Sequence, residues 1–182
     1  MSTGALQQAA DLLSAYEKMA QNNAWANATL YRAAQDLPEG AGQSSAPGFF
    51  PTLCRTLNHI YEVDLYYIDA LEVGGLGRAV YQREDEIALA VLAQKQAAAD
   101  ARLIAFCEAL TPQVLQEIRT TERQNCSVEE TVQALLLHLF QHQIHHRGQA
   151  HVQLHALGLS PPQLDEFHLL FDRAPSAKVY WS

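Results

Sequence analysis

The sequence predicts an all-α protein, built as a four-helix bundle with at least one long crossover connection. Apolar residues recur at steps of three and four over four long segments, and loops rich in Gly, Pro and small polar residues separate these segments. No alternating apolar and polar run is long enough to require a sheet. Helices of ~20–30 residues with loops of ~10–15 residues are typical of a bundle, and we expect a single domain over residues 1–182.

The first two helices are expected at about residues 5–37 and 51–73. The first should end at Pro38, because proline restricts the residue before it. The apolar stripe of the second helix is interrupted by Asp64, a carboxylate at a position that should face the core.

The third helix is expected at about residues 85–110 and the fourth at about 127–157. Residues 112–126 between them fit either a short extra turn or a pair of strands. Ser127 with Glu130 three residues later forms a capping box, which predicts that the fourth helix begins there. The tail after residue 158 should pack on the bundle through its apolar side chains, Phe167, Leu169, Leu170 and Phe171.

Composition and charge exclude several classes of function. The formal charge is -8 and no run of basic residues occurs, so a nucleic-acid surface is not expected. No apolar run approaches the ~20 residues of a membrane span, and no signal peptide is recognisable. Three cysteines, an odd number without a CxxC spacing, indicate reduced thiols. We therefore expect a cytoplasmic protein without a nucleic-acid or membrane partner.

Histidines provide the strongest functional signal, since five of the eight lie between residues 138 and 151. With Leu139 at the centre of the fourth helix's apolar stripe, His146 falls about 20° and His142 about 60° from it. Residues four apart share a helix face, so these two imidazoles could converge on one metal ion. Two core histidines satisfied by hydrogen bonds are the simpler alternative.

A third ligand would have to come from another helix. His59 is the only histidine outside the C-terminal third, and on its own it would be read as a boundary residue. Together, His59, His142 and His146 would give three nitrogen ligands and one open position, the pattern of a catalytic metal site. The Glu of the HExxH motif is missing, so no general base is built into the fourth helix.

Two further residues are candidates for supporting roles. Asp64 could hydrogen-bond the second nitrogen of a ligand histidine on the fourth helix, or form a salt bridge or cap. Arg147 is either a surface charge, the simpler interpretation, or an anchor for an acidic group of a substrate. Trp25 should fill the core, or else line a pocket.

Three motifs resemble those of the DinB/YfiT-like superfamily, the DinB family of bacterial metal-binding bundles. They lie in the first, second and fourth helices, and the resemblance covers about residues 16–170. The motifs are Trp25-Ala26-Asn27, Leu57-Asn58-His59-Ile60 followed by Asp64, and His142 with His146-Arg147-Gly148-Gln149.

The resemblance implies a four-helix bundle that is often dimeric. It also implies a divalent metal held by one histidine of the second helix and two of the fourth, which correspond to His59, His142 and His146. We expect zinc or nickel, with iron and manganese as alternatives, because imidazole suits several metals. A rival ligand set is His138, His142 and His145, which has i, i+4, i+7 spacing but lies off the apolar stripe.

Three functions remain open at this point. Some relatives are transferases that use low-molecular-weight thiols, so the chain could be a metal-dependent S-transferase or hydrolase acting on a small electrophilic substrate. It could instead be a non-catalytic metal-binding or stress-response protein, with the same three ligands and a closed fourth position. A helical scaffold without metal is the third possibility.

Overall fold

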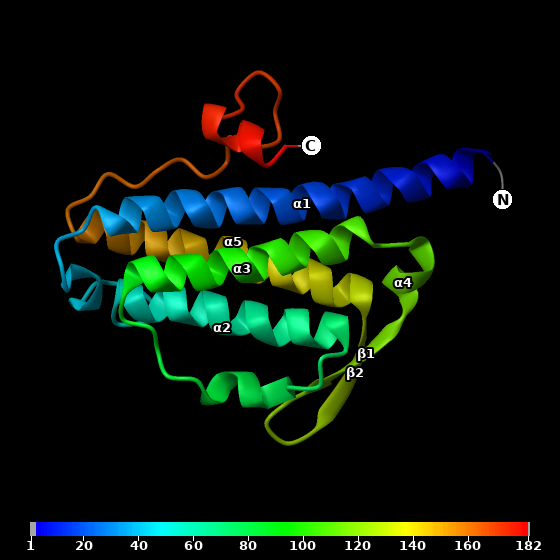
Figure 1. Cartoon of the computed structure of the whole chain (residues 1–182), viewed down its shortest axis with the longest axis horizontal. Coiled ribbons are helices and arrows are strands. Elements are labelled where there is room, and N and C mark those ends of the chain that lie inside the picture. Colours follow the sequence, from blue (N-terminus) through cyan, green and yellow to red (C-terminus); the bar gives the residue numbers. More distant parts are fainter. Residues whose placement is uncertain (1–2, 182) are drawn as a thin grey trace.

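The computed structural model describes residues 3–181 and confirms the four-helix bundle (Figure 1). Helices α1 and α2 each pack against both α3 and α5, so α1 and α2 lie diagonally across the bundle (Figure 1). The four bundle helices are α1 Thr3–Gln35, α2 Leu53–Glu72, α3 Leu89–Glu108 and α5 Val132–Ala156.

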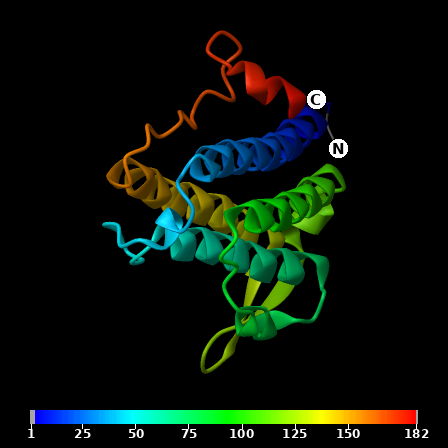
Figure 2. The same ribbon diagram turned by 60° about the vertical axis from the view of Figure 1, so that its left-hand side comes forward.

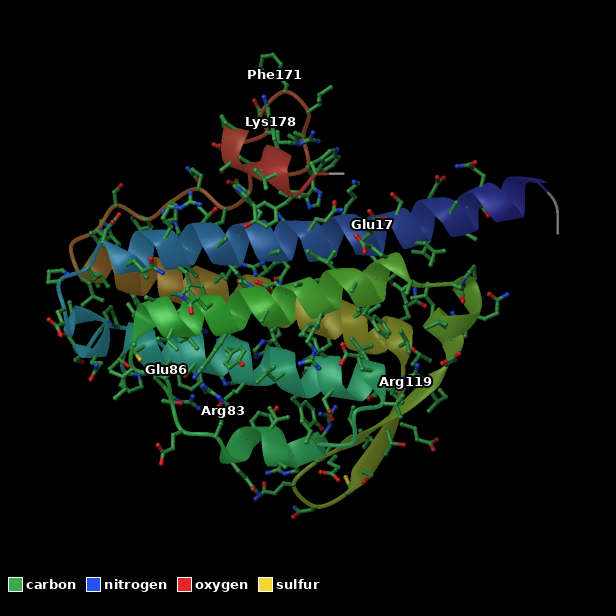
Figure 3. The ribbon with its side chains drawn as sticks, in the orientation of Figure 1. Glu17, Arg83, Glu86, Arg119, Phe171 and Lys178 are labelled. Carbon is green, nitrogen blue, oxygen red and sulfur yellow. The ribbon has the colours of Figure 1, made fainter. Side chains whose placement is uncertain are left out.

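The expected long crossover joins α2 to α3. These two helices run in the same direction, so residues 73–88 must return along the length of the bundle (Figure 1). This connection includes the short 3₁₀ helix η2, Gly77–Gln82. Asn58 of α2 fixes the end of this connection that leads into α3. The Asn58 side chain accepts from Glu86 N at 2.8 Å and donates to Glu86 O at 2.9 Å. Figure 3 shows Arg83 and Glu86 on this segment.

The predicted start of the fourth helix at Ser127 is wrong. Residues Ser127–Thr131 form strand β2, which pairs antiparallel with β1, Ile118–Glu122. Pairing satisfies the backbone of the supposed capping box, and Thr131 caps α5 instead by accepting from Ala134 N at 3.1 Å. Residues 112–126 were expected to form either a short extra turn or a pair of strands. Both occur in this region, because the short helix α4, Pro112–Gln116, precedes the hairpin.

The expected third helix also begins later than predicted, at Leu89 rather than residue 85. The hydrogen bonds between Asn58 and Glu86 keep the preceding segment outside the helix, and Ala88 is extended. The first and second helices differ from prediction by only one or two residues at each end.

The C-terminal tail packs across α1, as expected, on the opposite side of the bundle from the hairpin (Figure 2). Trp25 is buried against Phe167, with ring centroids 5.7 Å apart, and its Nε1 donates to Ser176 Oγ at 3.0 Å. Ser176 lies in the 3₁₀ helix η3, Pro175–Val179. The prediction that the next three apolar residues of the tail also pack on the bundle is wrong. They form an exposed tip with Phe171 at its end (Figure 3). The tip residues are Leu169, Leu170 and Phe171.

Between the four helices the apolar core forms two parts, and a third cluster, around Trp25 and Phe167, lies under the C-terminal tail. One part lies toward the hairpin end of the bundle and the other toward the end of α1 and the start of α2. On each helix, buried polar residues lie at the boundary between the stretches that contribute to these two parts. This polar layer consists of Asn23, Asn27, Asp64, Gln96, Asp100, Gln143 and Arg147.

No helix within residues 3–181 is both long enough and apolar enough to cross a membrane.

Candidate metal centre

Three histidines converge where α2 packs against α5. One ring nitrogen of each of His59, His142 and His146 lies within 4.8 Å of the other two, so the three could hold a metal ion. Nε2 of His59 and Nε2 of His142 are 3.1 Å apart. The α5 pair shares a face because its members are one turn apart, and packing of α2 on α5 brings the third ring to them.

The rival histidines lie outside this group. His138 and His145 are both exposed, and His138 packs its ring against Tyr67 with centroids 5.0 Å apart. Within the described part of the chain, the structure places His146 rather than His145 beside His59. His146 lies inside the apolar stripe of α5, and this position accounts for its buried side chain.

Hydrogen bonds orient two of the three rings. His59 Nδ1 lies 3.1 Å from Glu62 Oε1, and His146 Nδ1 lies 2.9 Å from Gln149 Oε1. Both partner oxygens are acceptors, so each imidazole carries its proton on Nδ1 and keeps a lone pair on Nε2. Such contacts fix the tautomer of metal-binding histidines.

The electrostatics of the centre favour neutral rings. Burial, together with the neighbouring rings of His146 and His59, lowers the pKa of His142 to about 3. Burial also lowers the pKa of His146. Burial acts to raise the pKa of Glu62, but hydrogen bonds from His59 and Arg55 outweigh it, and the pKa lies below its ordinary value. The two α5 rings are therefore neutral, and the Glu62 carboxylate beside them is ionised.

This donor set fits a divalent ion. Neutral imidazole is the form that binds metals, and three such nitrogens suit zinc, nickel and related ions better than magnesium or calcium. The Nδ1 atom of His142 is buried and has no hydrogen-bond partner among residues 3–181. The cluster is therefore not a set of core histidines in which each ring nitrogen is satisfied by the protein.

Phe50 forms an apolar wall of the centre. Its ring centroid lies 4.6 Å from that of His59 and 5.9 Å from that of His146. The loop carrying Phe50 is fixed by Gln153 of α5, whose Nε2 donates to Phe50 O at 2.9 Å. The side chain of His59 is 21% exposed, so the centre is reached from the surface beside this wall.

Asp64 is buried, as its place in the stripe predicts, but it contacts none of the three histidines. It accepts hydrogen bonds from Gln96 Nε2, at 2.7 Å, and from Gln143 Nε2. Asp64 is therefore part of the polar layer, and the carboxylate beside the histidines is Glu62. Burial and the nearby Asp100 raise the pKa of Asp64 to about 8.

Arg147 is buried, so its interpretation as a surface charge is wrong. Its Nη1 donates to Asn27 Oδ1 at 3.0 Å, to Gln143 Oε1 at 3.1 Å and to Asn23 Oδ1. Asn27 in turn donates to Asp100 at 3.0 and 3.2 Å. These contacts join α1, α3 and α5 and leave Arg147 on a different face of α5 from the histidines.

Sequence reasoning missed Glu62, Gln149 and Phe50. The first two were detectable, because each follows a proposed ligand by three residues and therefore shares its helix face. Phe50 lies in a loop, whose path no periodic pattern predicts.

Comparisons with known proteins agree with this fold. The profile described as "DinB family" matches residues 1–175. The chain belongs to the DinB family. The Protein DinB of Bacillus subtilis (strain 168) is 24% identical over 167 residues, and the match covers 85% of this chain and 92% of that protein. The crystal structure of a DinB-like protein, YjoA, from Bacillus subtilis superposes with a TM-score of 0.59 at 18% identity, covering 80% of this chain and 96% of the other. This structural likeness concerns the fold.

Proposed function

We propose that this DinB-family protein is a metal-dependent enzyme that binds one divalent ion, zinc or nickel, through His59, His142 and His146. The observation that carries the proposal is the convergence of three imidazoles, with one ring nitrogen of each within 4.8 Å of the other two. Family membership supports it, because metal binding is the property that the resemblance implies. A bound divalent ion supplies Lewis acidity, which makes a thiol or a water molecule more acidic.

The protein's own groups prepare this centre for an incoming ligand. Glu62 holds the proton of His59 on Nδ1, and Gln149 does the same for His146, so both Nε2 lone pairs stay available. Phe50 covers two of the rings and excludes water from that side. The partial exposure of His59 leaves an approach for a small molecule.

Thiol transfer is favoured over hydrolysis by the groups around the centre. Hydrolysis by an HExxH-type site needs a carboxylate free to take a proton from water. Among residues 3–181, Glu62 is the carboxylate that contacts these histidines, and it is already bound to His59 and to Arg55, at 2.8 Å. A thiol is acidic enough to be activated without a separate base. We therefore propose S-transfer from a low-molecular-weight thiol to a small electrophile.

The test is turnover by protein loaded with one equivalent of zinc or nickel. Thiol loss should be followed with a panel of low-molecular-weight thiols and electrophiles, and ester hydrolysis should be followed in parallel. We expect thiol conjugation that His142→Ala abolishes and that Leu137→Ala, at an exposed position of α5, leaves intact. Metal bound at one equivalent without turnover on any panel would contradict the enzyme and favour a non-catalytic metal-binding protein.

A further inference from the structure

A separate pocket of 490 Å³ lies between α1, α5 and the C-terminal tail. We call it the tail pocket. Its apolar lining comes from Met19, Ile144 and Leu164, one from each of these elements. Gly148 also lines it, and a Cβ built there would meet nothing within 4 Å, so the absence of a side chain keeps the space open. None of the three converging histidines lines it.

Two buried polar side chains of the tail pocket have unused hydrogen-bonding capacity. Asn22 is only 8% exposed, and its amide has no hydrogen-bond partner within the described residues. Arg147 is 4% exposed, and all its hydrogen bonds leave from Nη1. Its Nε and Nη2 therefore have no partner in the described part of the chain, and no carboxylate lies within 4.0 Å of the guanidinium there.

None of these donor atoms is among the fully buried atoms without a partner, so they are open to solvent in the tail pocket and can donate to a ligand there. A guanidinium presents its N–H groups as a planar fork that matches a carboxylate, and an amide N–H adds a neighbouring donor. The ligand that satisfies both residues is thus an anion with planar oxygens. The apolar lining requires the rest of that ligand to be hydrocarbon, and the volume is in the range of small-molecule sites, ~300–1,000 Å³.

The walls of the tail pocket are held in place. His151 of α5 lies 3.1 Å from Pro162 O through Nε2, and Ser176 accepts from Trp25 on α1. Asp165 lies at the exposed rim, where its charge disfavours a ligand with several negative charges. A single carboxylate therefore fits better than a phosphate.

We propose that the tail pocket binds a small organic monocarboxylate, with its carboxylate against Arg147 and Asn22 and its hydrocarbon part against the apolar lining. This site is distinct from the proposed metal centre and does not depend on it. For a ligand of this size, we expect a dissociation constant on the order of 1 mM.

The experiment is a titration of the full chain with hexanoate, followed through the side-chain NMR resonances of the Asn22 amide and Arg147 Nε. Both should shift and saturate, whereas hexanol, which has the same chain without the charge, should bind at least about tenfold more weakly. Asn22→Leu should weaken hexanoate binding about tenfold. Gly148→Leu, which fills the pocket, should abolish it, and Leu137→Phe on α5 is the control that should not change it.

A carboxylate could also reach a metal ion, so the titration is repeated with His142→Ala, which should bind hexanoate as tightly as the parent chain. These variants keep Arg147 and its network intact, so the test does not depend on a substitution that could unfold the bundle. Equal binding of hexanol, an unchanged affinity in Asn22→Leu, loss of binding in His142→Ala, or no saturable shift in the parent chain would each overturn the proposal.

Discussion

At the scale of single residues, the proposed metal centre depends on side chains that are not themselves ligands but hold the ligand histidines in place. Glu62 is the clearest case, because it accepts from His59 and carries a negative charge close to the proposed ion. Carboxylates in this position orient the ring and raise its basicity as a ligand.

Glu62→Ala should therefore weaken metal binding about tenfold, and Glu62→Gln should weaken it less because an amide oxygen can still accept. Competition with a chromophoric chelator measures the affinity. Glu84→Ala, at an exposed position of the crossover, is the matched control. An unchanged affinity in Glu62→Ala would show that this carboxylate does not support the centre.

Asp64 should make the stability of the chain depend on pH. Its pKa is raised to about 8 in the folded state, from an ordinary value of 3.8. Since the folded state holds this proton more tightly, the contribution of Asp64 to stability is full below pH ~4 and is lost as pH rises to ~8. Its slope is at most about 1.4 kcal/mol per pH unit.

Asp64→Asn removes this titration and keeps a polar group of the same shape. Relative to the parent chain, Asp64→Asn should therefore become more stable as pH rises from 5 to 8. Urea unfolding at several pH values measures the difference. A difference that is constant across this range would mean that Asp64 titrates normally when buried.

At the scale of elements, the helices meet through a polar layer as well as through apolar stripes. Asn27 is central to it, because it donates to Asp100 of α3 and accepts from Arg147 of α5. The same layer reaches α2 through Gln143 and Asp64. These directional contacts stabilise the rotation of α5 in which His142 and His146 face α2.

Asn27→Leu should lower the free energy of unfolding by about 3 kcal/mol or more, because it leaves a buried carboxylate and a buried guanidinium short of partners. Chemical denaturation measures this loss. Gln94→Ala, at an exposed position of α3, should change the free energy by about 0.5 kcal/mol or less. Equal effects of the two substitutions would contradict a structural role for the layer.

Much of the helical pattern was predictable, and the exceptions have physical reasons. Apolar periodicity located the four helices and placed His146 in a buried stripe. It also identified Asp64 as a carboxylate at a core position. It did not predict the partners of Asp64, because these lie on α3 and α5 and depend on how the helices pack. Arg147 was misread for the same reason. Ser127 was misread because the signal of a capping box is local, whereas pairing with β1 is not.

At the scale of the whole molecule, the homodimer expected from the family resemblance remains a proposal. The exposed tip of Leu169, Leu170 and Phe171 supports it, since a contiguous exposed apolar segment is typical of an interaction surface. Sedimentation equilibrium should give twice the chain mass of 20.2 kDa, and replacing the three tip residues with Ser should shift the mass toward one chain. A single-chain mass for the parent protein at high concentration would contradict the dimer.

The central claim is that the packing of α2 on α5 creates a metal site. It is tested most directly by elemental analysis of protein purified without an affinity tag, comparing the parent chain with His142→Ala. We predict about one equivalent of a divalent transition metal per chain, lost in the variant while its helical circular dichroism is retained. Absence of metal from the parent chain, even after reconstitution with zinc or nickel, would contradict the site and leave a helical scaffold as the better description.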